Sequence, residues 1–327
     1  MGNCTKFEVV DNIGILTFTR PPVNAVNQEI RLTLTELFEK EQMEFELVFV
    51  SDGSRDGTFA EIKKASEADP RIKGVEFSRN FGKEAGIFAG LELATGDAVI
   101  VMDCDLQHPP EVVPKMWELW KQGAQIVEGK KSSRGKESIF YKMSAGLFYK
   151  IMSGLIQMDM SSSSDFKLLD RKVVDVLLQL PERNTFFRAL TFWAGFDSQT
   201  VEYEVQERKF GTSKWNFFSL MKYAIANATS FSTLPLQLVT FMGTVSIIFS
   251  VILGIQTLVK YLTGNSVEGF TTVILLILII GGFIMLSLGI IGHYIARVYE
   301  EVKGRPKYVI NRVTDNVKGN VTGGWKR

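Results

Sequence analysis

The sequence predicts an α/β domain with a mostly parallel sheet, followed by a hairpin of two transmembrane helices. Two observations predict this fold class. From residue 45 to residue 130, short runs rich in β-forming residues alternate with helical patterns, which is typical of a parallel sheet with helices on its faces. Further along, residues 236–259 and 270–291 contain no charged residue, and each stretch supplies the ~20 apolar residues that a spanning helix needs.

The elements of the α/β domain follow one another in a regular order. The expected strands are residues 45–51, 72–78, 98–103 and 124–129. The expected helices include residues 61–69, 86–94 and the segment that opens at 109–117. In parallel sheets, ligands bind beyond the carboxyl ends of the strands, so polar residues that follow these strands are the first candidates for a site.

The charges around the apolar hairpin predict its orientation. Its connection, residues 261–269, is short and carries one acid, whereas basic residues flank the pair. These are Lys214, Lys222, Arg297, Lys303, Arg305 and Lys307. The positive-inside bias places both chain ends in the cytoplasm. Residues 216–235, with many aromatics and few charges, predict an interfacial amphipathic helix. The alternatives are buried core helices of a soluble protein for the hairpin and a core helix for 216–235.

Composition excludes several classes of function. The net charge of +1 gives no field that would gather nucleic acid. Two cysteines and two histidines argue against a disulfide framework, a histidine-rich zinc site and Ser-His-Asp chemistry. The amino terminus shows no secretory signal pattern. Carboxylates must therefore carry most of the chemistry, and the sequence leaves open whether the chain forms a homo-oligomer.

The segment AVIVMDCDLQHPPE places two acids at the end of a buried strand. Side chains of an extended chain alternate between faces, so Asp103 and Asp105 point the same way, and Gln107 follows if the extension continues. Two carboxylates and a carboxamide form a hard oxygen site that suits Mg²⁺ or Mn²⁺. A D-x-D pattern alone also occurs in surface loops, but the apolar strand before it and the proline-started helix after it favour a site.

Other candidates follow further strands or flank the membrane region. Asp52 is either a ligand for a base or ribose or part of an ordinary glycine turn. Lys83, at a helix start, either reaches a phosphate or is solvated. Asp165 precedes the apolar FKLL and is expected to face a cleft, whereas Asp170 is expected to cap a helix. In ERKFGTSKW, the cations around a flexible Gly-Thr-Ser suit a diphosphate or a lipid phosphate, or anchor the domain to anionic lipid.

Together these motifs resemble family-2 glycosyltransferases of the GT-A (Rossmann-like) fold, in the branch of dolichol-phosphate mannose synthase and the bacterial polyprenyl-phosphate (bactoprenol) glucosyltransferases. The resemblance runs from about residue 31 to 310. It is carried by SDGSRDGT (51–58), FSRNFGKEAG (77–86), DCDLQHPPE (103–111), SDFKLLDRKVV (164–174), LPER (180–183), KFGTSKW (209–215) and IIGHYIARVYEEVKGRPKY (290–308).

The resemblance implies a role for each candidate. Asp52 is expected to recognise the nucleotide, and Lys83 and Asp103 to bind the nucleotide sugar. Asp103, Asp105 and Gln107 are expected to hold the metal and diphosphate, with Asp165 and Asp105 as the catalytic carboxylates. The implied loop that closes on phosphates contains Arg208, Ser213 and Lys214. The basic groups implied for the lipid phosphate are Lys130, Lys131 and Arg134.

The activity implied is transfer of a hexose, from a donor such as UDP-glucose, to undecaprenyl phosphate with inversion, for modification of a cell-envelope glycan. Mg²⁺ or Mn²⁺ would be the cofactor, and the catalytic domain would lie on the cytoplasmic side of the cell membrane. The expected divisions are an atypical segment (1–30), a catalytic domain (31–215), an interfacial helix (216–235), two spans (236–293) and a cytoplasmic tail (294–327). A catalytically impaired membrane scaffold and a processive polysaccharide synthase are the alternatives.

The amino terminus departs from the family pattern. Where relatives carry a Pro-x-Tyr-Asn-Glu motif, this chain reads NIGILTFTRPPVNAVNQEI, which resembles the opening of a crotonase (enoyl-CoA hydratase) domain. The stretch is too short to imply acyl-CoA chemistry. Three interpretations remain open: a diverged first strand with Asn27 and Glu29 as partial substitutes, a genuine fusion, or a misjoined gene model.

Overall fold

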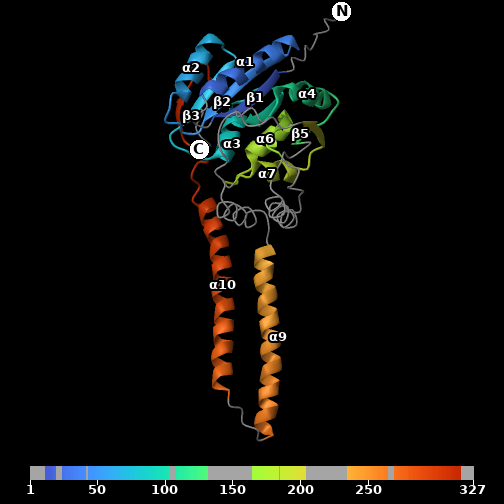
Figure 1. The fold of residues 1–327 in the computed structure, drawn as a ribbon, viewed down its shortest axis with the longest axis vertical. Coiled ribbons are helices and arrows are strands. Elements are labelled where there is room, and N and C mark those ends of the chain that lie inside the picture. Colours follow the sequence, from blue (N-terminus) through green and yellow to red (C-terminus); the bar gives the residue numbers. More distant parts are fainter. Residues whose placement is uncertain are drawn as a thin grey trace, which may run out of the picture. The chain divides into compact units, whose positions relative to one another are not determined.

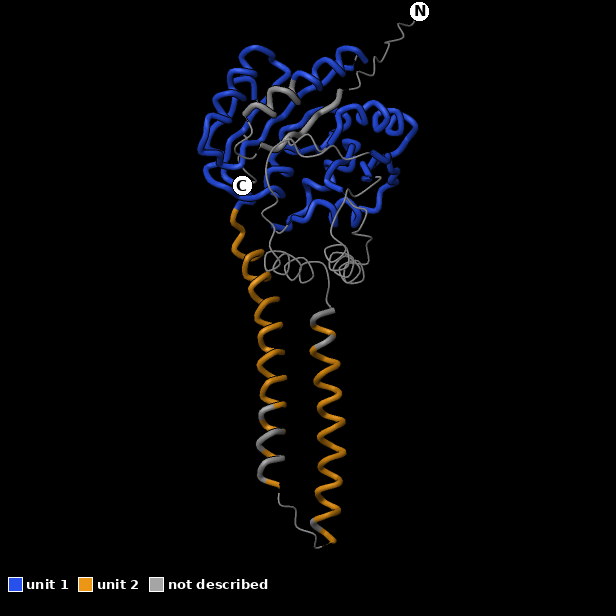
Figure 2. Tube along the Cα trace, in the orientation of Figure 1, with its two compact units in different colours: residues 1–153, 158–214, 306–327 blue, residues 154–157, 215–305 orange. Residues whose placement is uncertain are grey.

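The chain divides into two compact units (Figure 2). Unit 1 contains residues 1–153, 158–214 and 306–327, and unit 2 contains residues 154–157 and 215–305. The computed structural model describes residues 12–19, 24–41, 43–103, 108–131, 164–183, 185–203, 234–263 and 269–317. Each unit is described below by itself.

The described part of unit 1 contains a mixed sheet, whose strands follow the order β7-β5-β6-β4-β1-β2-β3-β8. Figure 1 labels β1, β2, β3 and β5 of this sheet. The strands are β1 (Asn12–Thr19), β2 (Glu44–Ser51), β3 (Ile72–Phe77), β4 (Ala98–Asp103), β5 (Ile126–Lys131), β6 (Lys167–Asp170), β7 (Ser198–Tyr203) and β8 (Ile310–Val313). Only β6 and β8 pair antiparallel with their neighbours. The predicted α/β fold with a mostly parallel sheet is therefore confirmed.

The four strands expected from the sequence correspond to β2, β3, β4 and β5. A first strand in the amino-terminal segment was one of three open interpretations, whereas β6, β7 and β8 were not expected. The segment of β6 is only four residues long and is bounded by two acids, so its apolar residues carry no period that separates strand from helix. β7 and β8 are edge strands whose outward residues are exposed, which weakens their hydrophobic pattern.

The atypical amino-terminal stretch supplies the central strand. β1 lies between β2 and β4 and pairs parallel with both, with Thr19 opposite Ser51 and Phe18 opposite Asp103. The structure therefore shows a first strand of this sheet at residues 12–19. The next helix, α1 (Asn24–Lys40), contains Asn27 and Glu29 in its backbone, but their side chains lie outside the described residues.

Helices cover both faces of the sheet. The helices of unit 1 are α1, α2 (Thr58–Ala68), α3 (Lys83–Leu93), the 3₁₀ turn η1 (Pro110–Val112), α4 (Val113–Lys121), α6 (Arg171–Gln179) and α7 (Phe187–Trp193). Phe45, Leu47 and Phe49 of β2 pack in one core with residues of α1 and α4. Val48 and Val50 alternate with them and are also buried, and α3 packs against β1 and β2. Because β2 is buried on both faces, apolar residues occupy most of its positions on either face, as expected for an interior strand.

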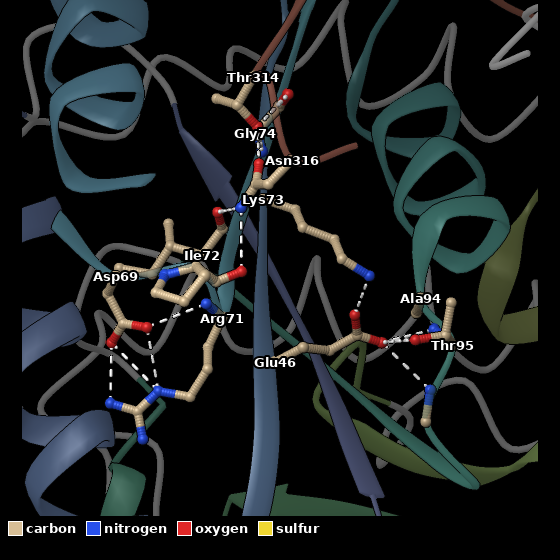
Figure 3. Close-up of polar contacts among 12 residues, drawn as sticks. Glu46, Asp69, Arg71, Ile72, Lys73, Gly74, Ala94, Thr95, Thr314 and Asn316 are labelled. Atoms are coloured by element: carbon tan, nitrogen blue, oxygen red, sulfur yellow. Dashed lines mark hydrogen bonds and ion pairs between the residues drawn. The ribbon is translucent and has the colours of Figure 1, made fainter. Parts of the chain in front are cut away.

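One acid breaks this apolar run, and its surroundings explain why it is tolerated (Figure 3). Glu46 is only 9% exposed, and it accepts hydrogen bonds from Thr95 N, Thr95 Oγ1 and Gly96 N. It also forms an ion pair with Lys73 of β3. The carboxylate therefore ties the loop before β4 to β2 and β3, and a buried charge with this many partners is stable.

We expect Glu46→Ala to lower the free energy of unfolding by about 3 kcal/mol or more, because it leaves the Lys73 ammonium and buried N–H groups without their acceptor. Thermal unfolding of the detergent-solubilised protein measures this effect. Glu44→Ala, at the exposed start of the same strand, is the matched control, and it should change the stability by less than about 0.5 kcal/mol. Equal effects of the two changes would contradict this account.

Unit 2 contains two long apolar helices, α9 (Leu234–Leu262) and α10 (Phe270–Val302), which contact each other. Residues Val239–Lys260 and Ile279–Val302 have mean hydropathies of 2.0 and 1.9, and neither window is buried inside the protein. Hydroxyls within α9 donate to the preceding turn, as Thr240 Oγ1 does to Leu236 O at 3.2 Å. This pattern satisfies hydroxyls that would have no access to water inside a bilayer. Two candidate membrane helices are thus present, and they associate the chain with a membrane.

α10 extends beyond residue 293, where the second span was expected to end, and continues to Val302. The expected division into spans and tail stays a prediction, because a helix can extend past the part that crosses a bilayer. At 1.5 Å per residue, 33 residues extend over about 50 Å, more than the ~30 Å of a hydrocarbon core. From Pro306 the chain belongs to unit 1, where β8 pairs with β3. Residues 306–317, called here the return segment, are therefore part of the folded domain.

Candidate active site

Four predicted residues lie along one edge of the sheet. Asp52 follows β2, Lys83 opens α3 shortly after β3, and Asp103 is the last residue of β4. These strands are parallel, so their carboxyl ends share an edge. Asp165 precedes β6, which runs the other way, and this reversal brings the beginning of β6 to the same edge. The antiparallel strand is thus what adds Asp165 to the site.

Lys83 connects the two carboxylates. Its Nζ donates to Asp103 Oδ2 at 2.7 Å and lies 2.7 Å from Asp165 Oδ2. The structure therefore brings together three of the predicted site residues. The Lys83 ammonium is paired with two acids, while its side chain remains 32% exposed, so its predicted role at a phosphate stays a prediction.

Arg188 of α7 completes this cluster, and sequence reasoning missed it. Its Nε donates to Asp165 Oδ1 at 2.6 Å and its Nη2 donates to Asp165 Oδ2 at 2.9 Å. Such a two-point pair fixes the orientation of both groups. A signal was available, because Arg188 interrupts the apolar segment TFFRALTFW. An arginine in such a segment usually has a partner.

His108 contacts residues on both sides of this cluster. Its Nδ1 accepts a hydrogen bond from Asp103 N at 3.0 Å, and its ring stacks on Phe166 with the ring centres 4.8 Å apart. Phe166 follows Asp165 directly in the chain. His108, which is 5% exposed, therefore links the backbones that carry the two carboxylates. It is placed to position the acids rather than to exchange protons with solvent.

The charges of the cluster stabilise one another. Burial raises the pKa of Asp165, but Lys83 and Arg188 outweigh it, so the pKa lies well below its usual range. For Asp103, burial again opposes ionisation and Lys83 prevails, which lowers the pKa. Burial lowers the pKa of Lys83, yet Asp103 and Asp165 raise it overall. All three groups are therefore charged at neutral pH, and Asp165 is a poor proton acceptor.

Glu84, beside Lys83, behaves differently. Burial, followed by repulsion from Asp165, raises the pKa of Glu84 to about 7, although Phe187 N donates to its Oε2 at 2.9 Å and Lys83 and Arg188 favour its charged form. The carboxyl group thus joins α3 to the start of α7. Because this carboxyl is uncharged in the fold at mildly acidic pH, the native state holds a proton that the unfolded chain has lost.

This difference predicts that stability falls as pH rises from about 4.5 to about 7, since the folded state binds more protons than the unfolded state over that interval. Glu84→Gln keeps an oxygen acceptor for Phe187 N but cannot ionise, so it should flatten this part of the profile. Thermal unfolding between pH 5 and pH 8 tests the prediction. Glu61→Gln, at an exposed position of α2, should leave the slope unchanged.

Asp52 organises the loop that leads to Lys83. Its Oδ1 accepts from Phe81 N at 2.6 Å and its Oδ2 accepts from Gly82 N at 3.0 Å. Gly53, with a φ of 65°, allows this approach, because a Cβ there would lie 2.3 Å from the carbonyl carbon of Arg79. Asp52 therefore lies at the predicted edge, and both its oxygens hold the backbone of the Lys83 loop.

Of the remaining candidates, the structure describes only Lys130 and Lys131. Lys130 and Lys131 end β5, which is linked to the Asp165 region by the bond from Gly129 N to Phe166 O at 2.8 Å. They thus share the edge of the sheet with Asp165, and no contact between them and Asp165 is seen. The structure does not describe Asp105, Gln107, Arg134, Arg208, Ser213 and Lys214. Of the interfacial helix expected at 216–235, residues 216–233 also lie outside the described residues.

The carboxylates of the cluster are oxygen donors of the kind that a divalent cation binds. Asp103 and Asp165 are ionised oxygen donors that already hold a cation, the Lys83 ammonium, between them. Within the described ranges, no three His, Cys, Asp or Glu side chains gather as a metal site. Asp103 is thus the one predicted metal ligand whose position is known. Its charge and its place at a strand end suit a metal ligand, and its assignment to the metal stays a prediction.

Comparison with known proteins identifies the family. The model of the glycosyl transferase family 2 matches residues 17–178. The putative glycosyltransferase CsbB of Bacillus subtilis is 42% identical over 283 residues, which cover 86% of each chain. The family-2 resemblance is confirmed. The chain belongs to glycosyl transferase family 2. As a family-2 member it is a glycosyltransferase.

This family-2 glycosyltransferase has further relatives. The SfII prophage-derived bactoprenol glucosyl transferase of Shigella flexneri is 40% identical over 285 residues, covering 86% of this chain and 91% of the relative. Among solved structures, glucosyl-3-phosphoglycerate synthase from Mycobacterium tuberculosis, in complex with Mn²⁺, UDP and phosphoglyceric acid, aligns with a TM-score of 0.46 and 17% identity. That alignment covers 67% of this chain and 75% of the synthase.

Proposed function

We propose that this glycosyltransferase moves a glucosyl group from UDP-glucose to undecaprenyl phosphate, with inversion at the anomeric carbon. The observation that carries the proposal is the cluster of Asp103, Lys83 and Asp165 in a chain that also has two exposed apolar helices. The name of the Shigella flexneri relative, a bactoprenol glucosyl transferase, supports both the sugar and the lipid. The product would serve modification of a cell-envelope glycan.

The proposed reaction is a single displacement. An oxygen of the lipid phosphate forms a bond to the anomeric carbon while the bond from that carbon to UDP breaks, and the electron pair leaves with UDP. The second pKa of a phosphate monoester is near ~6, so the acceptor is already ionised at neutral pH. No strong base is required, which agrees with the lowered pKa of Asp165.

The side chains then have electrostatic roles. Asp165 holds Lys83 and Arg188 at fixed positions. Its negative charge is also proposed to stabilise the positive charge that develops on the sugar in the transition state. Lys83, at the opening of α3, is proposed to attract the donor diphosphate. Lys130, Lys131 and Arg134 are proposed for the lipid phosphate, and Arg208, Ser213 and Lys214 for a loop that closes on the donor. Asp52 is proposed to act in nucleotide recognition through the loop that it holds.

A divalent ion, Mg²⁺ or Mn²⁺, is proposed as cofactor, held by Asp103, Asp105 and Gln107. When bound, it would offset negative charge on the leaving diphosphate. The proposed location is the bacterial cell membrane, with both spans crossing it and with the catalytic domain and both termini in the cytoplasm. The basic residues after the second span, such as Arg297 and Lys303, support this orientation.

Purified membranes incubated with radiolabelled UDP-glucose and undecaprenyl phosphate, with and without Mn²⁺, test the proposal. Lipid-soluble label that requires the metal is the expected result. Insoluble polymer would instead indicate a processive synthase, and the absence of any transfer would indicate a membrane scaffold. UDP-galactose and GDP-mannose in parallel reactions define the donor.

A further inference from the structure

The return segment, which is part of unit 1, contacts β3 and α3. Arg312 of β8 pairs with the buried Glu76 of β3, with Nε to Oε2 at 2.7 Å and Nη2 to Oε1 at 2.9 Å. Thr314, which is fully buried, accepts from Gly74 N at 2.9 Å, and Asn316 Nδ2 donates to Pro70 O at 3.0 Å (Figure 3). The bonds of Thr314 and Asn316 hold the end of the segment against the first half of β3, whereas Arg312 lies opposite Glu76 near the carboxyl end of that strand.

The beginning of the segment contacts the carboxyl end of the same strand. Tyr308 is 1% exposed, and its ring stacks on Phe77 with centres 4.9 Å apart and planes tilted by 16°. Ser78 N donates to Val309 O at 2.9 Å. Phe77 in turn meets Phe81 edge-on, with ring centres 5.7 Å apart. The strand end that leads into the Lys83 loop is therefore held by the return segment.

The same residues also hold the helix that follows the loop. The Tyr308 hydroxyl donates to Glu92 Oε2 of α3. Lys307 Nζ lies 4.4 Å from the centre of the Phe88 ring, also on α3, and donates to Leu180 O at 3.3 Å. Tyr308 thus contacts both elements that flank residues 78–82, namely β3 and α3. α3 begins at Lys83, which pairs with Asp103 and Asp165, so Tyr308 contacts the two elements between which the Lys83 loop runs.

We propose that Tyr308 is a positioning residue for the donor site, and that it acts by holding the loop carrying Lys83 between β3 and α3. This inference rests on the proposed function for the meaning of the donor.

The test compares two buried positions of the return segment. Tyr308→Leu removes the contacts with Phe77 and Glu92, so amide hydrogen exchange of residues 79–83 should accelerate and the KM for UDP-glucose should rise about tenfold, with the KM for undecaprenyl phosphate unchanged. Thr314→Val is the matched control, because it removes a buried hydrogen bond at the other end of the segment. It should lower the melting temperature but leave both loop exchange and donor KM as they are.

A third variant keeps the test decisive if Tyr308→Leu does not fold. Tyr308→Phe keeps the ring on Phe77 and loses only the bond to Glu92, so it should fold and show a smaller rise in loop exchange and in donor KM. If the folded Tyr308 variants lose stability as Thr314→Val does, with loop exchange and donor KM unchanged, Tyr308 is merely structural and the inference is overturned. Hydrogen exchange and binding of UDP with Mn²⁺ do not depend on the sugar or the lipid. A selective change in both, in a chain that transfers nothing to lipid, would support the inference and reject the proposed function.

Discussion

Asp165→Asn is expected to reduce kcat/KM by about 10³-fold, the scale seen when a preorganised charged group is removed from an active site. Asparagine preserves the shape but not the charge, so Lys83 and Arg188 both lose the counter-ion that fixes them. Initial rates of lipid-soluble label, at several donor concentrations, measure the loss. The effect should persist across the neutral pH range, because a carboxylate with a lowered pKa does not act by exchanging a proton.

The matched control for this change is Asp175→Asn. Asp175 lies in α6, its side chain is 54% exposed, and it is 3.9 Å from Arg171. Exposed pairs of this kind contribute at most about 1 kcal/mol, so the control should retain normal rates and stability. Extraction with detergent verifies that both variants are inserted in the membrane. A near-normal rate for Asp165→Asn would remove Asp165 from the catalytic machinery.

Lys83→Met is expected to lower kcat/KM by about 10²-fold or more, through loss of a positive charge beside the donor phosphates. Methionine fills much of the same volume, but it leaves Asp103 and Asp165 facing each other without the ammonium between them. Repulsion between these acids should also weaken the native arrangement. Binding of UDP in the presence of Mn²⁺, followed by isothermal titration calorimetry, separates a loss of donor affinity from a loss of turnover.

Lys64→Met provides the comparison for Lys83→Met. Lys64 is an exposed lysine of α2, so its replacement should change neither UDP binding nor turnover. If Lys83→Met bound UDP and transferred glucose as the unaltered chain does, the contact between Lys83 and the two acids would be structural only.

The sequence alone determined the parts of this protein that depend on local patterns. The apolar stretches that became α9 and α10 are recognised by length and lack of charge. Asp103 ends a strand, and Asp52 and Lys83 follow strands. The composition of these segments predicts strands, and the carboxyl ends of parallel strands share one edge of a sheet. Asp170 was expected to cap a helix, and its side chain accepts from Lys172 N at the start of α6. The ordered motifs also led to the family.

Only the tertiary structure decided which charges meet. Asp165 joins the site because β6 runs antiparallel, and its partner Arg188 comes from a helix 23 residues further along the chain. Tyr308 meets Glu92 across 216 residues, and the segment expected to be a tail became an edge of the sheet. The physical reason is that hydrophobic periodicity reports which face of an element is buried but not what covers it. Ion pairs and edge pairing between distant segments are fixed only when the chain packs.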